Sequence, residues 1–146
     1  ELGGDVVLVD GDDLAERVKA ATQGAVIKLG VDAVNGMATE RIASCLQDGS
    51  EVLAYGMLTG EPCMISPDTS FLRDIKLIGF YTIRQFAKRK PEEVRKVYDH
   101  LARLFEEGKL SAKIAGTYSL DNVKDAVAHA GRRGAEREGK VILTMA

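Results

Sequence analysis

The sequence lacks the features that would place it in several large classes of protein. It has no tryptophan and only two cysteines among 146 residues, which excludes the disulfide framework of a small secreted domain. No apolar run approaches the roughly 20 residues that span a bilayer, and the start of the chain lacks a signal-peptide pattern. The formal net charge of −2 would not attract nucleic acid or anionic lipid. We therefore expect no nucleic-acid or membrane partner, and a reducing compartment, the cytoplasm.

Sequence signatures of catalysis and of metal binding are absent as well. Neither glycine-rich phosphate loop, G-x-G-x-x-G or G-x-x-x-x-G-K-[ST], occurs in the chain, and no nucleophile, base and orienting partner can be assembled. His100 and His129 have no ligand cluster at metal-binding spacing, and we interpret them as exposed helix residues. Cys45 is interpreted as a small core residue. The sequence therefore predicts no catalytic and no metal-binding residue in this chain.

What the sequence does contain is an alternation of short apolar runs and amphipathic segments. Its length suits one domain, and 45% hydrophobic and 29% charged residues are typical of a soluble globular protein. Apolar runs predict strands at residues 6–9, 25–34, 52–55, 75–78 and 141–145. Apolar spacing, caps and glycine stops predict helices at residues 14–22, 37–47, 91–105 and 120–130, the last capped by Ser119, and a helical turn near 71–72. The alternation predicts an α/β fold with a parallel sheet.

Two of these strands end in a way that suggests a ligand crevice. Residues 52–55 end at Gly56 and a loop, and residues 75–78 end in Gly79-Phe80-Tyr81-Thr82. Ligands of open α/β sheets bind just outside the carboxyl ends of the strands. Tyr55 is accordingly either a ring that stacks on a ligand or an ordinary half-buried strand residue. Phe80 and Tyr81 either face the same crevice or cover a sheet edge.

The glycines and the turn at residues 35–38 leave similar alternatives open. Gly56 and Gly60 either allow a ligand to approach the backbone or serve as turn residues. The segment Asn35-Gly36-Met37-Ala38 either offers backbone N–H groups to a ligand or simply starts a helix, and we favour the helix start.

Several stretches, taken together, resemble the medium-chain dehydrogenase/reductase superfamily. They are residues 29–36 (LGVDAVNG), 55–62 (YGMLTGEP), 76–81 (KLIGFY), 107–110 (EGKL) and 139–145 (GKVILTM). Their order and spacing agree over nearly the whole chain. Within the superfamily, they resemble most closely the NADPH-dependent 2-enoyl thioester reductases of fatty-acid synthesis. Related quinone reductases share most of these features.

The resemblance implies a particular domain organisation. Residues 1–108 would be the second half of a dinucleotide-binding (Rossmann) domain, and residues 109–146 a helix–strand segment that returns to a catalytic domain. The glycine-rich loop, the catalytic tyrosine and any zinc ligands would then lie upstream of this chain. The first residue is Glu1, and we expect the chain to be a piece of a longer protein.

The resemblance also implies site residues, a reaction and a partner. Residues matching cofactor-contacting positions are Tyr55, Gly56, Met57, Leu58, Phe80, Tyr81, Thr82 and Lys140. The implied reaction is hydride transfer from NADPH to the β-carbon of an enoyl thioester, and the implied assembly is a homodimer through residues 74–81. Two departures stand out: the family usually has Gly-Gly at Asn35-Gly36, and Trp-Leu at Tyr81-Thr82. The alternatives are a quinone reductase, a non-catalytic dimerising fragment and an unrelated flavodoxin-like module.

Overall fold

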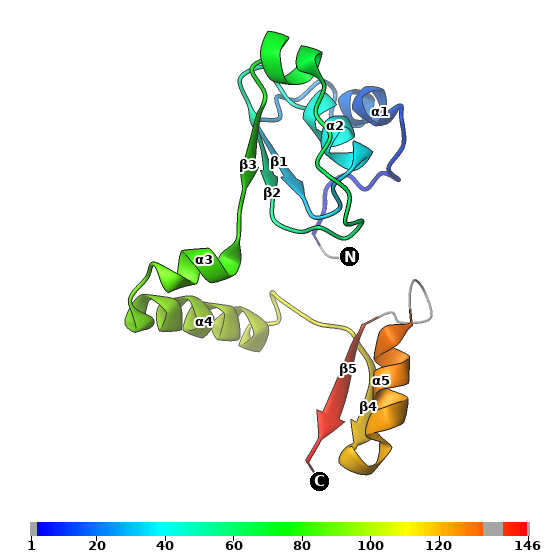
Figure 1. Ribbon diagram of the computed structural model, residues 1–146, viewed down its shortest axis with the longest axis vertical. Helices are drawn as coiled ribbons and strands as arrows, with labels where there is room; N and C mark the ends of the chain where they lie inside the picture. Colours follow the sequence, from blue (N-terminus) through cyan, green and yellow to red (C-terminus); the bar gives the residue numbers. More distant parts are fainter. Residues whose placement is uncertain (1–2, 133–138, 146) are drawn as a thin grey trace. The chain divides into compact units, whose positions relative to one another are not determined.

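The computed structural model describes residues 3–132 and 139–145, and the chain divides into two compact units at residues 88 and 89 (Figure 1). The first unit contains α1 (Leu14–Ala21), β1 (Leu29–Asp32), α2 (Met37–Ser44), β2 (Glu51–Ala54), a π-helical turn (Asp68–Leu72), β3 (Lys76–Gly79) and α3 (Thr82–Ala87). The second contains α4 (Pro91–Glu106), β4 (Ile114–Ser119), a 3-10 turn (Leu120–Asn122), α5 (Val123–Gly131) and β5 (Lys140–Thr144).

The first unit is built on a parallel sheet in the order β1-β2-β3. All three strands have four residues and pair in register, so that Leu29, Glu51 and Lys76 lie across from one another at one end. At the other end Asp32, Ala54 and Gly79 lie in the same row. The three carboxyl ends therefore finish at one level, which is where α/β sheets bind ligands.

Helix α2 covers one face of this sheet. Val52, which is fully buried, packs there with Ala43, Leu46 and Ile75, and Ile27, Ile42 and Ile65 surround this core. Gly30 allows the close approach, because a Cβ at this position would collide with the Ile42 side chain. Within this unit the described elements leave the opposite face uncovered: Leu29 and Val31 are 55% and 54% exposed. A parallel sheet is normally covered on both faces, so the described residues of this unit supply one of the two layers.

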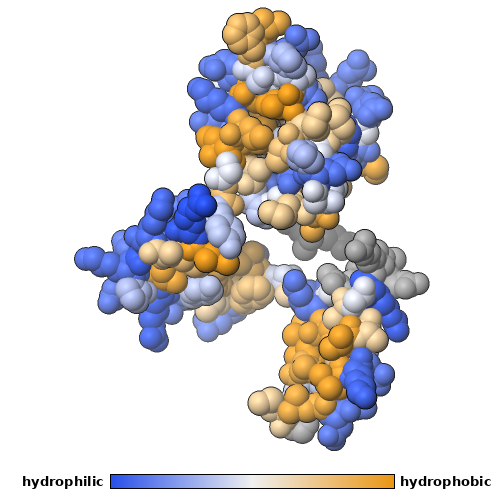
Figure 2. All heavy atoms as spheres, in the orientation of Figure 1, coloured by the Kyte–Doolittle hydropathy of each residue, from blue (hydrophilic) through white to orange (hydrophobic). Residues whose placement is uncertain are grey.

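The second unit has a smaller sheet of two parallel strands, β4 and β5, with α5 packed on both. Among its described residues Ala126 is the buried apolar side chain. Figure 2 shows apolar side chains gathered on the surface of this unit over its strands, where Ile142 and Leu143 are 40% and 43% exposed. None of the described helices is both long and apolar enough to cross a bilayer.

Most of the predicted elements are confirmed. The helices at residues 14–22, 37–47 and 91–105 correspond to α1, α2 and α4, and the strands at 52–55, 75–78 and 141–145 correspond to β2, β3 and β5. The long strand predicted at residues 25–34 shortens to β1. Gly24 and Gly108 end helices with φ of +74° and +69°, which glycine adopts without strain.

The strand predicted at residues 6–9 is wrong. These residues form no strand, and Val7 and Val9 are 87% and 83% exposed. A strand needs a neighbour for its backbone N–H and C=O groups, and the described part of the chain places none beside this segment.

Two elements were not foreseen, and one cap was misplaced. Strand β4 is weakly apolar, and its pairing with β5 decides its conformation. Helix α3 has only six residues and follows β3 directly. Ser119 ends β4 and starts the 3-10 turn, so α5 begins later, after Asn122.

Candidate functional site

The segments that leave β1 and β2 run side by side at the carboxyl edge of the three-stranded sheet. The backbone N–H of Tyr55 donates to the carbonyl of Asp32 over 2.9 Å, and that of Leu58 donates to Ala33 over 3.0 Å. Thr59 donates to the Val34 carbonyl twice, from its N–H at 3.2 Å and its hydroxyl at 2.8 Å. These bonds fix the segment after β2 against the turn after β1.

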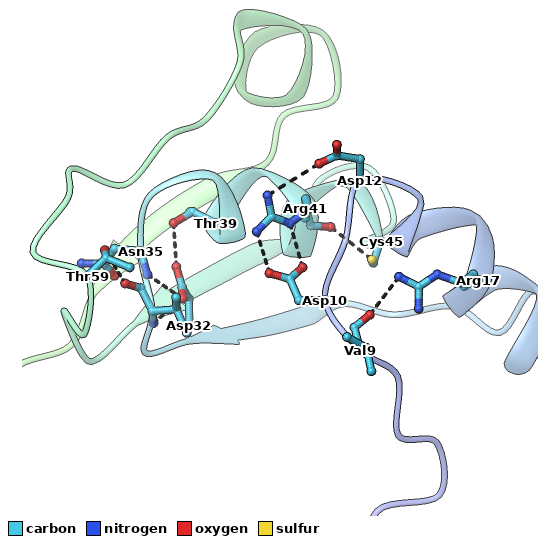
Figure 3. A network of polar contacts seen from close by, with 11 residues as sticks. Val9, Asp10, Asp12, Arg17, Asp32, Asn35, Thr39, Arg41, Cys45 and Thr59 are labelled. Atoms are coloured by element: carbon cyan, nitrogen blue, oxygen red, sulfur yellow. Dashed lines mark hydrogen bonds and ion pairs between the residues drawn. The ribbon is translucent and has the colours of Figure 1, made fainter. Parts of the chain in front are cut away.

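Asp32 organises the turn between β1 and α2 (Figure 3). Its fully buried carboxylate accepts hydrogen bonds from the backbone N–H groups of Val34 (2.8 Å) and Asn35 (3.1 Å) and from the Thr39 hydroxyl (2.6 Å). Burial by itself would raise the pKa of Asp32, but these hydrogen bonds outweigh it and the pKa is lowered. Asp32 is therefore held as a carboxylate that stabilises the turn.

This arrangement bears on the two alternatives for residues 35–38. The N–H group of Asn35 already donates to Asp32, and α2 begins at Met37, as the helix-start interpretation expects. The role of Asp32 was not predicted from the sequence. Its signal was an aspartate two residues before Val34, at the spacing where an Asx side chain bonds the following backbone.

A second carboxylate, Glu40 on α2, holds the loop that leads from β2 to β3. It accepts hydrogen bonds from the Ser66 N–H (2.7 Å), the Ser66 hydroxyl (2.8 Å) and the Thr69 hydroxyl (2.6 Å). Burial alone would raise the pKa of Glu40, yet these bonds lower it overall. Arg41, the next residue of α2, makes a two-pronged ion pair with Asp10, at 2.7 and 2.6 Å.

Seven of the eight residues predicted to contact a cofactor, all except Lys140, follow two neighbouring strands, β2 and β3. Tyr55 follows β2, and Phe80 follows β3 and donates its N–H to the Ala54 carbonyl over 2.8 Å. Apolar side chains are uncovered here: Tyr55, Met57, Leu58 and Tyr81 are each more than half exposed, and Phe80 is 39% exposed. Thr82 is the first residue of α3. Lys140 is the exposed first residue of β5, in the second unit.

The two glycines of the first strand end have different reasons to be glycine. A Cβ on Gly56 would lie 2.7 Å from the Ala33 carbonyl oxygen, so this glycine allows the two segments to approach each other. Gly60 has φ of +73° and open space around it, as a turn residue does.

One histidine differs from its interpretation as an exposed helix residue. His129 is half-buried, and its Nδ1 lies 2.9 Å from the Tyr118 hydroxyl, with the two rings edge to face. The interpretation was wrong because β4, which carries Tyr118, was not foreseen. His100 is exposed as expected.

Cys45 is half-buried, its thiol donates to the Arg41 carbonyl, and burial raises the pKa of the thiol.

Comparison with known proteins gives these strand ends a context. A family model described as "Zinc-binding dehydrogenase" matches residues 2–143. The chain belongs to this family. It is thereby a member of the medium-chain dehydrogenase/reductase superfamily, and the fold is a partial Rossmann-like α/β region with parallel sheets.

Individual relatives are distant and longer. The mitochondrial enoyl-[acyl-carrier-protein] reductase of Schizosaccharomyces pombe is 24% identical over 121 residues, which are 83% of this chain and 32% of that protein. A Bacillus thuringiensis protein named as an NADPH:quinone reductase has 25% identity and a TM-score of 0.76, over 91% of this chain and 40% of that one. Etr1p in complex with NADP and crotonyl-CoA has 22% identity and a TM-score of 0.66, over 82% and 35%. The chain thus spans about a third of the S. pombe relative.

The family's description names zinc, and the described residues do not fit it. Across residues 3–132 and 139–145, no three His, Cys, Asp or Glu side chains are placed to hold a metal ion. A structural or catalytic zinc site needs at least three such protein ligands. No step of the function proposed below runs through zinc.

Proposed function

We propose that this chain supplies the nicotinamide side of an NADPH site in a 2-enoyl thioester reductase. The observation that carries the proposal is the pair of strand ends that lie next to each other in register, residues 55–58 after β2 and residues 80–82 after β3. Their uncovered aromatic and aliphatic side chains suit a flat ring that must be kept from water. Lys140 is proposed as a further NADPH contact from the resemblance alone.

NADPH, when bound, supplies the hydride. The proposed roles of this chain are to position the nicotinamide ring and to exclude water from it. Tyr55 and Phe80 would hold the ring by stacking or by edge contacts. Met57 and Leu58 would shield it from water, which strengthens the electrostatic interactions inside a closed site. We assign none of these groups to the proton that the reaction adds, because the resemblance places the catalytic tyrosine upstream of this chain.

The substrate and the assembly belong to the same proposal. An enoyl thioester is supported by the S. pombe relative's name and by the crotonyl-CoA held by Etr1p. A homodimer through residues 74–81 is supported by β3, which pairs with β2 on one edge and exposes Leu77 and Ile78 at 38% and 39%. Exposed apolar edge strands readily pair with another chain. We also propose residues 1–108 as the Rossmann part and the cytoplasm as the compartment, although the S. pombe relative is named as mitochondrial.

The test uses the complete product of the gene that encodes this chain. NADPH oxidation is followed with crotonyl-CoA and, separately, with a quinone. Turnover of crotonyl-CoA supports the proposal. Turnover of the quinone alone moves the chain to the quinone reductases, the alternative favoured by the B. thuringiensis protein. Absence of NADPH binding favours a non-catalytic dimerising piece.

A matched pair of variants tests the strand ends directly. Tyr55→Ala is expected to weaken NADPH binding about tenfold, which corresponds to about 1.4 kcal/mol. Phe71→Ala removes an exposed ring of the same unit, 81% exposed and outside both strand ends, and is expected to leave binding unchanged. Equal affinities for the two variants would contradict a role for Tyr55.

For the assembly, Ile78→Lys is expected to convert a dimer to a monomer in sedimentation experiments.

A further inference from the structure

Asn35 has a buried hydrogen-bond acceptor that the described chain does not use. The residue is 9% exposed, and its side-chain oxygen Oδ1 is shielded from solvent without a hydrogen-bond partner among the described residues. The great majority of buried side-chain oxygens in proteins have a partner. A buried acceptor without one is costly, and at the carboxyl edge of an α/β sheet it suggests a missing ligand.

The turn itself does not require an asparagine. Asn35 has φ of +71°, in the left-handed region that glycine adopts with least strain. Glycine would therefore serve the backbone better. The Asn35 side chain is therefore expected to have a role other than stabilising the backbone of the turn.

The neighbouring groups do not supply the missing donor. The Asn35 N–H and the Thr39 hydroxyl both donate to Asp32, and the Thr59 hydroxyl donates to the carbonyl of Val34. The Glu61 side chain lies directly against Gly36, where a Cβ would collide with its carboxylate oxygen. A carboxylate is an acceptor only, so Glu61 cannot donate a hydrogen bond to the Asn35 oxygen and itself needs a donor.

We propose that the Asn35 side-chain oxygen accepts a hydrogen bond from the nicotinamide-nucleoside half of NADPH, which makes Asn35 a cofactor-binding residue of this chain. The inference rests on the proposed function. That half of the cofactor carries two kinds of donor, the ribose hydroxyls and the carboxamide NH2. The terminal torsion of asparagine is broad, so a rotation of the amide would bring its oxygen to such a donor at little cost.

The experiment measures NADPH affinity, not turnover, in the complete gene product. Asn35→Gly removes the amide and suits a positive φ, so the turn is expected to form. The matched control is Gln23→Gly, because Gln23 is also an amide residue with positive φ (54°) and follows α1. Titration of NADPH fluorescence should show about tenfold weaker binding for Asn35→Gly and no change for Gln23→Gly. Competition with 2′,5′-ADP, which lacks the nicotinamide half, should give the same affinity in all three proteins.

A second titration distinguishes the two donors. In the 3-acetylpyridine analogue of NADPH a methyl ketone replaces the carboxamide. If the tenfold effect of Asn35→Gly disappears with this analogue, the carboxamide is the donor; if it persists, a ribose hydroxyl is. Equal NADPH affinity for Asn35→Gly and the unmodified protein overturns this inference and leaves the proposed function standing. No NADPH binding by the unmodified protein overturns both.

Discussion

The two units contain similar parts, parallel strands with a helix packed on them, but they are held together differently. In the first unit a buried core joins α2 to the sheet, and a fully buried carboxylate fixes the turn between β1 and α2. In the second unit the described buried apolar residue is Ala126, and a single side-chain hydrogen bond joins Tyr118 of β4 to His129 of α5. Burial of apolar surface is the main source of stability, and the described residues of the second unit fully bury few apolar side chains. The comparison indicates that stability resides mainly in the first unit, at the edge where the site is proposed.

The largest difference is expected between the two polar contacts. Asp32→Ala leaves two backbone N–H groups and the Thr39 hydroxyl without their acceptor, and should lower the free energy of unfolding by about 3–4 kcal/mol. Tyr118→Phe removes one hydrogen bond of the second unit, to His129, and should cost about 1 kcal/mol. Denaturant titration gives the totals, and amide hydrogen exchange assigns each loss to its unit. Similar losses would contradict the comparison.

The apolar contacts should differ in the same direction by a smaller amount. Val52 is fully buried, and Val52→Ala is expected to cost about 2–3 kcal/mol, because it removes contacts and leaves a cavity. Val141 of β5 is half-buried, and Val141→Ala should cost less than about 1 kcal/mol. Chemical denaturation of both variants measures the two values. A larger loss for Val141→Ala would show that the second unit has a core of its own.

The smallest expected effect is the acid dependence of the first unit. Asp32 and Glu40 have pKa values below their ordinary values of 3.8 and 4.5, because their hydrogen bonds outweigh the effect of burial. A lowered folded-state pKa contributes stability that is present above the unfolded value and is lost as pH falls through the folded value. Stability should therefore be constant from about pH 7 to about pH 5 and fall below about pH 4.

Thr39→Ala provides the control for this acid dependence, since the Thr39 hydroxyl is one of the groups that lower the pKa of Asp32. The variant should show a shallower loss of stability with acid than the unmodified chain. Urea titrations at a series of pH values measure both slopes. An unchanged slope would place the acid sensitivity elsewhere.

The elements that the sequence predicts well are those whose pattern is local. The helix α4 shows its proline start, apolar face and glycine stop within one stretch of sequence, and the structure has it at Pro91–Glu106. Strand β2 is an apolar run bounded by turns. Strand β4 was not predicted, because its residues become a strand only by pairing with β5, which begins 20 residues or more along the chain. Residues 6–9 show the opposite error. They were predicted as a strand but stay irregular, because the apolar run has no neighbouring strand among the described residues.

The candidate site shows the same division. Tyr55 and Phe80 could be named from sequence because both follow apolar strands, and the register of the sheet confirms that their strands are neighbours. Asp32 was missed because its importance comes from three donors that only the folded turn brings together. The side-chain oxygen of Asn35 was missed for a related reason, because the lack of a partner is visible only when the surroundings of an atom are known.

The in-register pairing of β1, β2 and β3 has a consequence for how this region can vary in length. Adding or deleting one residue inside β2 would move each later side chain to the opposite face of the sheet and carry Tyr55 out of line with Asp32. In the long connection between Ala54 and Lys76 the restriction applies where hydrogen bonds hold it to other elements, as at residues 55–59, 64, 66 and 69. Between these points insertions are expected at little entropic cost, as in other surface loops. Homologous chains should therefore differ in length between these strands and keep the strands themselves at constant length.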